Sequence, residues 1–129
     1  MIALAVSDSV ICERAFEFSS RILVLGDKLW DRSPGARHVA RQVMESGTSI
    51  GATAEEAQEG QTKPDYIAKM SVSRKEARET VMWLRLLLKN EYAAPAEISW
   101  ELDEAKQLLR MIRAAIRTAK QSSSRGNGL

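Results

Sequence analysis

The sequence predicts an all-α protein that folds as an antiparallel, up-down-up-down bundle of four helices. Hydrophobic residues make up 44% of the 129-residue chain, whereas aromatic residues make up 5% and only three residues are proline. This composition favours helices over a turn-rich β fold. In four separate segments, apolar residues recur in steps of three and four, which places them on one face of a helix. The length suits one domain, expected at residues 8–121 after a short N-terminal extension at 1–7.

The first helix is expected at residues 8–31, with Ser7 or Asp8 as a cap at its start. Its apolar stripe consists of Ile11, Ala15, Phe18, Ile22, Leu25 and Leu29. The sequence from Asp31 to Gly35 interrupts the pattern, because the residue before a proline avoids the α conformation and glycine is a weak helix former. The first helix should therefore end near Trp30.

The second helix is expected at residues 34–60, with Ser33 as its cap and Pro34 at its first position. Its stripe is made of small residues: Val39, Val43, Ser46, Ile50, Thr53 and Ala57. Each glycine inside a helix costs about 1 kcal/mol, so glycines there suggest that a neighbouring helix approaches closely. The predicted helix-packing motif is Ser46, Gly47, Ile50, Gly51 and Ala54.

The third helix is expected at residues 63–91 and the fourth at 96–121. Thr62 and Asp65 resemble a capping box at the start of the third. Its predicted core stripe is Ile67, Met70, Arg74, Ala77, Val81, Leu84 and Leu88, widened by Trp83 and Leu87. The stripe of the fourth is Ile98, Leu102, Ala105, Leu109, Ile112, Ile116 and Ala119. The tail at 122–129 is rich in serine and glycine and is expected to be disordered.

Charge and cysteine content narrow the classes of function. The net charge of +2 is too small for a domain whose whole surface binds polyanions, so any basic site must be local. Cys12 is the only cysteine, which excludes an internal disulfide and a cysteine-based zinc site. No apolar stretch reaches the roughly 18 residues of a membrane span, and the opening MIALAV lacks the features of a signal peptide. We expect a cytoplasmic protein without a membrane segment.

The sequence lacks most of the residue combinations on which enzyme active sites are built. The acids that could form a di-iron site are Glu55, Glu56, Glu76 and Glu79. Such a site in a helix bundle normally uses Glu-x-x-His pairs, whereas His38 is the sole histidine and has no glutamate three residues before it. Cys12 and His38 have no evident orienting acid, and no phosphate-binding loop follows a strand. We therefore predict no enzyme activity, no metal and no cofactor.

Basic residues form the one charge pattern that stands out along the sequence. Residues 97–104 contain four acids and no base, whereas six bases and no acid follow from Lys106 onward. The candidate nucleic-acid-binding residues are Arg74, Arg78, Arg85 and Lys89 on the third helix and Lys106, Arg110, Arg113, Arg117 and Lys120 on the fourth. Two interpretations stay open: phosphate binding, or a solvated face whose cations favourably oppose the helix dipole.

The stretch from Arg41 to Leu87 resembles the four-helix-bundle family typified by proteins encoded in intervening sequences of bacterial 23S ribosomal RNA genes. The resemblance lies in SGTSIGATAEEAQ from Ser46, DYIAKMS from Asp65 and KEARETVMWLRLL from Lys75. It implies a left-handed antiparallel bundle and, in relatives, a homopentamer. The accessory protein of diversity-generating retroelements is similar in fold and is thought to bind nucleic acid and a reverse transcriptase through a basic pentameric barrel.

The leading hypothesis is therefore a non-catalytic protein that self-associates, as a homopentamer by resemblance, and presents basic helix faces to RNA or DNA. A partner protein such as a reverse transcriptase is expected by analogy only. Trp83 and Leu87, expected to be exposed beside the main stripe, support self-association. The alternative is an oligomeric adaptor that binds another protein and has no role with nucleic acid.

Overall fold

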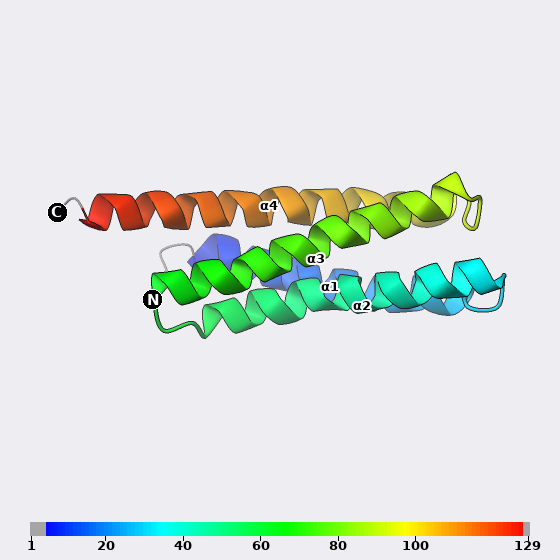
Figure 1. Ribbon diagram of the computed structural model, residues 1–129, viewed down its shortest axis with the longest axis horizontal. Coiled ribbons are helices and arrows are strands. Elements are labelled where there is room, and N and C mark those ends of the chain that lie inside the picture. Colours follow the sequence, from blue (N-terminus) through cyan, green and yellow to red (C-terminus); the bar gives the residue numbers. More distant parts are fainter. Residues whose placement is uncertain (1–4, 128–129) are drawn as a thin grey trace.

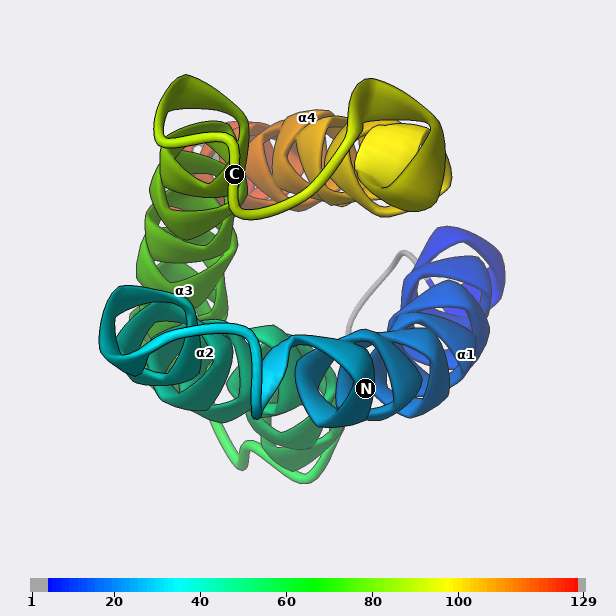
Figure 2. The same ribbon diagram turned by 90° about the vertical axis from the view of Figure 1, so that its right-hand side faces the viewer.

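The computed structural model describes residues 5–127, with side chains from residue 8 to residue 122. Its helices are α1 (Ala5–Leu29), α2 (Pro34–Gln58), α3 (Lys63–Lys89) and α4 (Pro95–Asn127), and no strand occurs in the described range (Figure 1). Each helix runs antiparallel to the next. Seen from the end, the four follow one another around a common axis (Figure 2). The predicted all-α four-helix bundle is confirmed, and none of the described helices is long and apolar enough to cross a membrane.

The starts of α2 and α3 lie where the sequence predicts them. The Ser33 hydroxyl accepts a hydrogen bond from the Ala36 N–H at 3.0 Å, and the Thr62 hydroxyl accepts one from the Asp65 N–H at 3.1 Å. Each cap is followed by a proline within the first turn, where a missing N–H removes no helix bond. Both predicted caps are confirmed.

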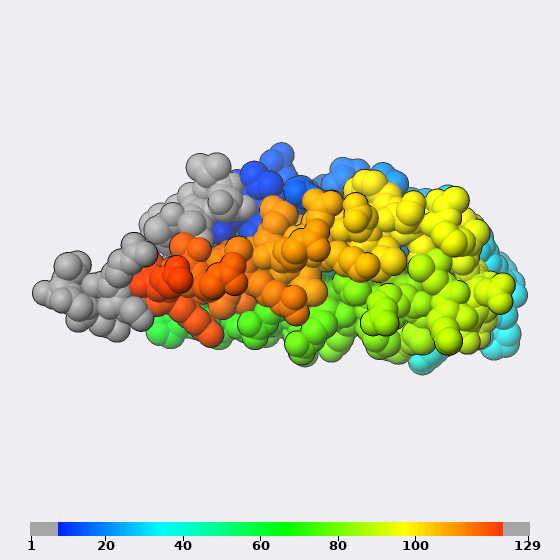
Figure 3. Space-filling model, turned by 90° about the horizontal axis from the view of Figure 1, so that it is seen from above, coloured from blue at the N-terminus to red at the C-terminus, as the bar shows by residue number. Residues whose placement is uncertain are grey.

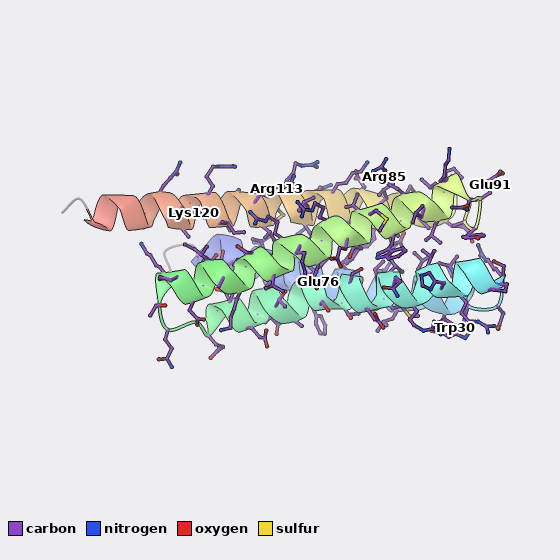
Figure 4. All side chains as sticks on the ribbon, in the orientation of Figure 1. Trp30, Glu76, Arg85, Glu91, Arg113 and Lys120 are labelled. Carbon is purple, nitrogen blue, oxygen red and sulfur yellow. The ribbon has the colours of Figure 1, made fainter. Side chains whose placement is uncertain are left out.

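The end of α3 has a feature that sequence reasoning missed. Glu91 adopts a left-handed backbone conformation with φ of 56° (Figure 4). Its N–H donates to the Leu88 carbonyl at 3.1 Å, and the Tyr92 N–H donates to the Leu87 carbonyl at 2.9 Å. This is the Schellman pattern that usually has glycine at the left-handed position. It turns the chain into the short connection that places α4 beside α3.

The start of α1 corrects one prediction. The helix begins at Ala5, so Asp8 lies in its first turn rather than at its cap. The Asp8 side chain is 1% exposed and accepts a hydrogen bond from the Tyr66 hydroxyl at 2.7 Å, while its second carboxylate oxygen has no partner within the described residues. A tertiary contact with α3 therefore uses the acid that local spacing assigned to a cap.

The end of α4 corrects a second prediction. The helix continues to Asn127, so residues 122–127 of the tail expected to be disordered are helical, and residues 128–129 lie outside the described range. No proline interrupts this segment, and each added residue gains a backbone hydrogen bond once a helix has formed. The Lys63 ammonium also donates to the Ser122 hydroxyl at 2.7 Å, which ties this end of α4 to α3.

The small residues of α2 bring α1 close, as predicted. A Cβ atom on Gly47 would lie 3.0 Å from Ile22, and one on Gly51 would lie 3.3 Å from the Cβ of Ala15 and 3.4 Å from its backbone. All five residues of the helix-packing motif are buried. The two glycines therefore occupy positions where a side chain would push α1 and α2 apart.

The core face of α3 differs from the predicted stripe by about one residue. Its buried residues are Tyr66, Met70, Ser73, Ala77, Thr80, Leu84 and Leu87. The Ser73 hydroxyl donates to the Ile50 carbonyl at 2.8 Å, and the Thr80 hydroxyl lies 2.8 Å from that of Ser46. Because these hydroxyls are small and find partners, they can occupy the core where α2 and α3 approach closely. Compared with the predicted stripe, α3 is therefore rotated about its own axis, and Arg74 lies at the edge of the core.

This rotation also corrects the argument for self-association. Leu87 is fully buried, and Trp83 is partly buried with its ring edge-on to His38 at 5.8 Å between centroids. Neither residue forms an exposed apolar patch. The large apolar side chains that are exposed lie mainly on α1: Val10, Phe16, Leu23 and Val24.

Candidate nucleic-acid interface

Helix α4 lies between α1 and α3 on one face of the molecule (Figure 3). It presents different charged residues to each of these neighbours. Toward α1 it presents acids from its first half. Glu104 pairs with Arg14 at 2.7 Å, Glu101 lies 3.9 Å from Arg21, and Glu97 pairs with Arg32. We call this set of three pairs the polar seam.

The two ends of the polar seam are well-formed hydrogen-bonded pairs. Arg14 donates to both carboxylate oxygens of Glu104, at 2.7 and 2.9 Å, and to the Gln107 side chain at 2.7 Å. Arg32 likewise donates to both oxygens of Glu97 and to the Tyr92 carbonyl. The Arg32 guanidinium and the Ala94 N–H lower the pKa of Glu97 to about 2. Three of the four acids in residues 97–104 are thus engaged by α1 and the loop that follows it, whereas the fourth, Asp103, lines a surface hollow together with Lys106.

The cations of α4 begin where its acids end and lie on the side toward α3. Lys106 lines a surface hollow together with Leu102 of α4 and Leu88 of α3. The next four cations follow in steps of four, three, four and three residues, which keeps them on the same side of the helix: Arg110, Arg113, Arg117 and Lys120. The Glu104 and Gln107 side chains point to α1 instead. Apart from Asp103, which lines the same hollow as Lys106, the two kinds of charge are therefore separated around α4 as well as along it.

The contact between Lys63 and Ser122 sets the register between α3 and α4. Counting equal numbers of residues from it, at roughly 1.5 Å each, places Arg74 near the level of Met111 and Arg78 near that of Gln107. Both arginines thus lie beside the basic half of α4. Arg85 and Lys89 reach the levels of its first residues, where the acids are.

The structure thus brings together seven of the nine predicted residues and separates two. The seven, which we call the basic face, are Arg74, Arg78, Lys106, Arg110, Arg113, Arg117 and Lys120. Arg113 and Lys120 are labelled along the basic half of α4, and Arg85 lies toward the opposite end of the bundle (Figure 4). Arg74 is partly buried and the other six are exposed.

The cations of the basic face are not neutralised by ion pairs with acidic side chains of the described residues. Within residues 8–122, none of its seven cations forms an ion pair, whereas Arg14, Arg32, Arg37 and Lys69 each pair with an acid. The helix dipole explains little of this pattern, since its effect is confined to the last turn. Lys106 to Lys120 all precede the last turn of a helix that ends at Asn127.

Most aromatic side chains lie away from the basic face. Trp100 packs on Phe18 under Arg21, toward α1, and Trp83 meets His38 of α2. Trp30, which is labelled in Figure 4 near the loop between α1 and α2, has its ring beneath Arg37 and Arg41. The remaining aromatics are Phe16 on α1, Tyr66 in the core and Tyr92 at the turn before α4. Trp100 also lines the hollow that holds Lys106, but Arg21 lies over its ring at 4.0 Å from the centroid, so among the described residues the basic face offers no open ring on which a base could stack.

Other candidate chemistry finds little support in the described residues. Burial, with Glu55 and Asp8 nearby, raises the pKa of Cys12 to about 11, so it is a thiol rather than a thiolate nucleophile at neutral pH. Burial and the neighbouring Glu79 raise the pKa of Glu76, which is labelled in Figure 4. Within the described range, no three His, Cys, Asp or Glu side chains are grouped to hold a metal ion.

Comparison with known proteins places the chain among helical bundles of the same kind. A family model described as 23S rRNA-intervening sequence protein matches residues 7–114. A solved structure from Bacteroides thetaiotaomicron VPI-5482, a protein of unknown function from the S23 ribosomal protein family, superposes with a TM-score of 0.79 at 30% identity. The match covers 86% of this chain and 98% of that one. No curated protein matches the sequence.

Proposed function

The chain belongs to the 23S rRNA-intervening sequence protein family, and from its charge distribution we propose that it is a non-catalytic protein that binds the phosphate backbone of RNA or DNA through the basic face. One observation carries the proposal. Seven cations gather on adjoining sides of α3 and α4 and have no acidic partner among the described residues. A polyanion supplies the missing partners and releases its own counterions when it binds.

The charge of the whole chain does not contradict a local site. Residues 1–62 contain six basic and nine acidic residues, a net charge of −3, whereas residues 63–129 contain 13 basic and eight acidic residues, a net charge of +5. The three acids of the polar seam are held on the opposite side of α4 and oppose the basic face only weakly. The field over the basic face is therefore stronger than the net charge of +2 suggests.

The salt dependence of RNA binding tests this proposal. We expect the full chain to bind mixed-sequence RNA at about 50 mM salt, and the logarithm of the binding constant to fall steeply with the logarithm of the salt concentration, by about 0.7 to 0.9 per phosphate neutralised. Fluorescence anisotropy with labelled RNA measures both quantities. The proposal fails if there is no binding at low salt, or if binding hardly depends on salt.

A pair of matched variants locates the site. Replacing Arg113 and Arg117 by glutamine removes two charges from the basic face and should lower the salt slope by about one for each residue. Replacing Arg37 and Arg41 by glutamine removes the same charge from the distant end of α2 and should change binding much less. If the control variant weakens binding as much as the first, total charge and not the basic face is responsible.

Self-association is a second part of the proposal, because α1 presents apolar side chains to solvent. Phe16 is 70% exposed, Val24 53% and Leu23 47%. Exposed apolar groups of this size favour contact with another protein surface. The resemblance to pentameric relatives makes a homopentamer the expected assembly, with a mass of five times the 14.4 kDa chain.

Light scattering of the purified protein tests the assembly. Replacing Phe16 and Leu23 by serine should reduce the mass toward that of one chain. The control is Val72→Ser, which removes an apolar group that is 42% exposed on α3 and should leave the mass unchanged. A monomeric wild-type protein would contradict this part of the proposal without affecting RNA binding.

The second candidate function is an adaptor that binds another protein. The same exposed side chains of α1 support it, since a partner could cover them in place of a second copy. The two candidates differ in the role of the basic face. An adaptor with no nucleic-acid role would show no salt-dependent binding of RNA.

A further inference from the structure

We propose that the basic face selects double-stranded over single-stranded nucleic acid, with its two rows of cations following the two phosphate backbones that border one groove. This inference rests on the proposed function and names the class of nucleic acid. It comes from the number of rows, from the position of the aromatic side chains, and from the side chains at the Lys106 end of the rows.

The basic face has two rows of cations because two helices contribute to it. The α4 row runs from Lys106 to Lys120, about 21 Å at 1.5 Å per residue, and the α3 row consists of Arg74 and Arg78. Packed helices lie about 8 to 10 Å apart. The grooves of a duplex, about 6 to 12 Å wide in B-form DNA, separate two phosphate backbones by similar distances. A single strand has one backbone and can follow only one row.

The absence of an open aromatic ring from the basic face also disfavours a single strand. Proteins that hold single strands combine cations with aromatic rings, and each stacked base contributes about 1 to 3 kcal/mol. Here Trp83 and Trp100 are turned toward α2 and α1, and Trp30 is covered by two arginines. In a duplex the bases are already stacked on one another, so the protein needs no rings.

At the Lys106 end of the basic face, the hollow between α3 and α4 is lined mainly by apolar side chains, among them Leu88 and Leu102, together with Trp100 and Asp103. The nearby amide of Gln107, a group able to recognise adenine, is held by Arg14 on the other side of α4. The basic face should therefore recognise the shape and charge of a duplex without preference for its sequence.

The test compares two RNAs with similar numbers of phosphates at the same salt concentration, and it is repeated with the matching DNAs because the groove widths given above are those of B-form DNA. One is a mixed-sequence duplex of about 20 base pairs, and the other is an unstructured oligo-uridine strand of about 40 nucleotides. We expect the full chain to bind the duplex at least about tenfold more tightly in fluorescence anisotropy. Equal or tighter binding of oligo-uridine overturns the inference and leaves the proposed function intact. If neither RNA binds, the proposed function fails and the inference with it.

A row-specific variant gives an independent readout. Replacing Arg74 and Arg78 by glutamine removes the α3 row, so the duplex should lose affinity several-fold while oligo-uridine, which can follow the α4 row alone, changes little. The matched control replaces Lys69 and Lys75 of α3, each beside an acid, and should preserve the preference for the duplex. Equal losses for both RNAs in the Arg74 and Arg78 variant would contradict the two-row geometry. Circular dichroism verifies that both variants fold.

Discussion

Helix α1 is held by its two neighbours in opposite ways. Against α2 it packs closely, with Ala15 and Ile22 meeting Gly51 and Gly47. Against α4 it forms the polar seam, in which partly exposed arginine and glutamate side chains form ion pairs. The close contact contributes stability through apolar burial, which salt does not weaken, whereas exposed ion pairs contribute little and are screened.

The polar seam has a consequence for function that the close contact does not have. By holding Glu97, Glu101 and Glu104 toward α1, it keeps three acids away from the cations of the same helix. The basic face is left without partners on the opposite side. Ion pairs that contribute little to stability thus set the distribution of charge that supports the proposed binding of nucleic acid.

The largest effect is expected where α1 and α2 touch. Gly51→Leu places a large side chain against the backbone of Ala15, which cannot move aside without separating the helices. We expect the free energy of unfolding to fall by about 1 to 3 kcal/mol. Urea denaturation at low and high salt measures it, and the loss should be the same at both. Ala52→Leu, at the exposed neighbouring position, is the control, and an equal loss there would contradict the packing argument.

A smaller effect is expected at the polar seam. Arg14→Ala removes the paired hydrogen bonds to Glu104 and the one to Gln107, and should lower the free energy of unfolding by about 1 kcal/mol at low salt. Near 1 M salt the screening length falls to about 3 Å, so the loss should shrink. A loss that stays constant with salt would mean that the hydrogen bond from the Arg14 guanidinium to the uncharged Met111 sulfur, at 3.4 Å, and not the ion pair with Glu104, accounts for the stabilisation.

The features confirmed from the sequence are those that depend on neighbours along the chain. The caps at Ser33 and Thr62 and the apolar stripes of α1, α2 and α4 depend on residues a few positions apart. The glycines of α2 also indicated close packing, because their presence inside a helix is unfavourable without it. Local spacing therefore predicted the four helices and one of their contacts.

The features that were missed depend on partners far away in the sequence. Ser73 and Thr80 entered the core of α3 because α2 offers them the Ile50 carbonyl and the Ser46 hydroxyl. The spacing of three and four residues along the helix had instead placed Arg74 and Val81 at that level. The division of the nine candidate cations into a cluster of seven and a separate pair likewise follows from the register of α3 against α4, which only the fold sets.

The smallest effect expected at the polar seam is a change with pH at Glu97. Because Arg32 and the Ala94 N–H lower its pKa from about 4.5 to about 2, the folded protein binds this proton less readily than the unfolded chain. The ionised carboxylate therefore stabilises the fold above about pH 4.5, and this contribution is lost as the pH falls toward 2. In Glu97→Gln, the melting temperature should lack this component of the decline between pH 4.5 and pH 2. Arg32→Gln should return the pKa of Glu97 toward its ordinary value, which NMR titration of the carboxyl carbon measures directly. A wild-type Glu97 that titrates near pH 4.5 would show that Arg32 does not engage it in solution, and that the polar seam is open at this end.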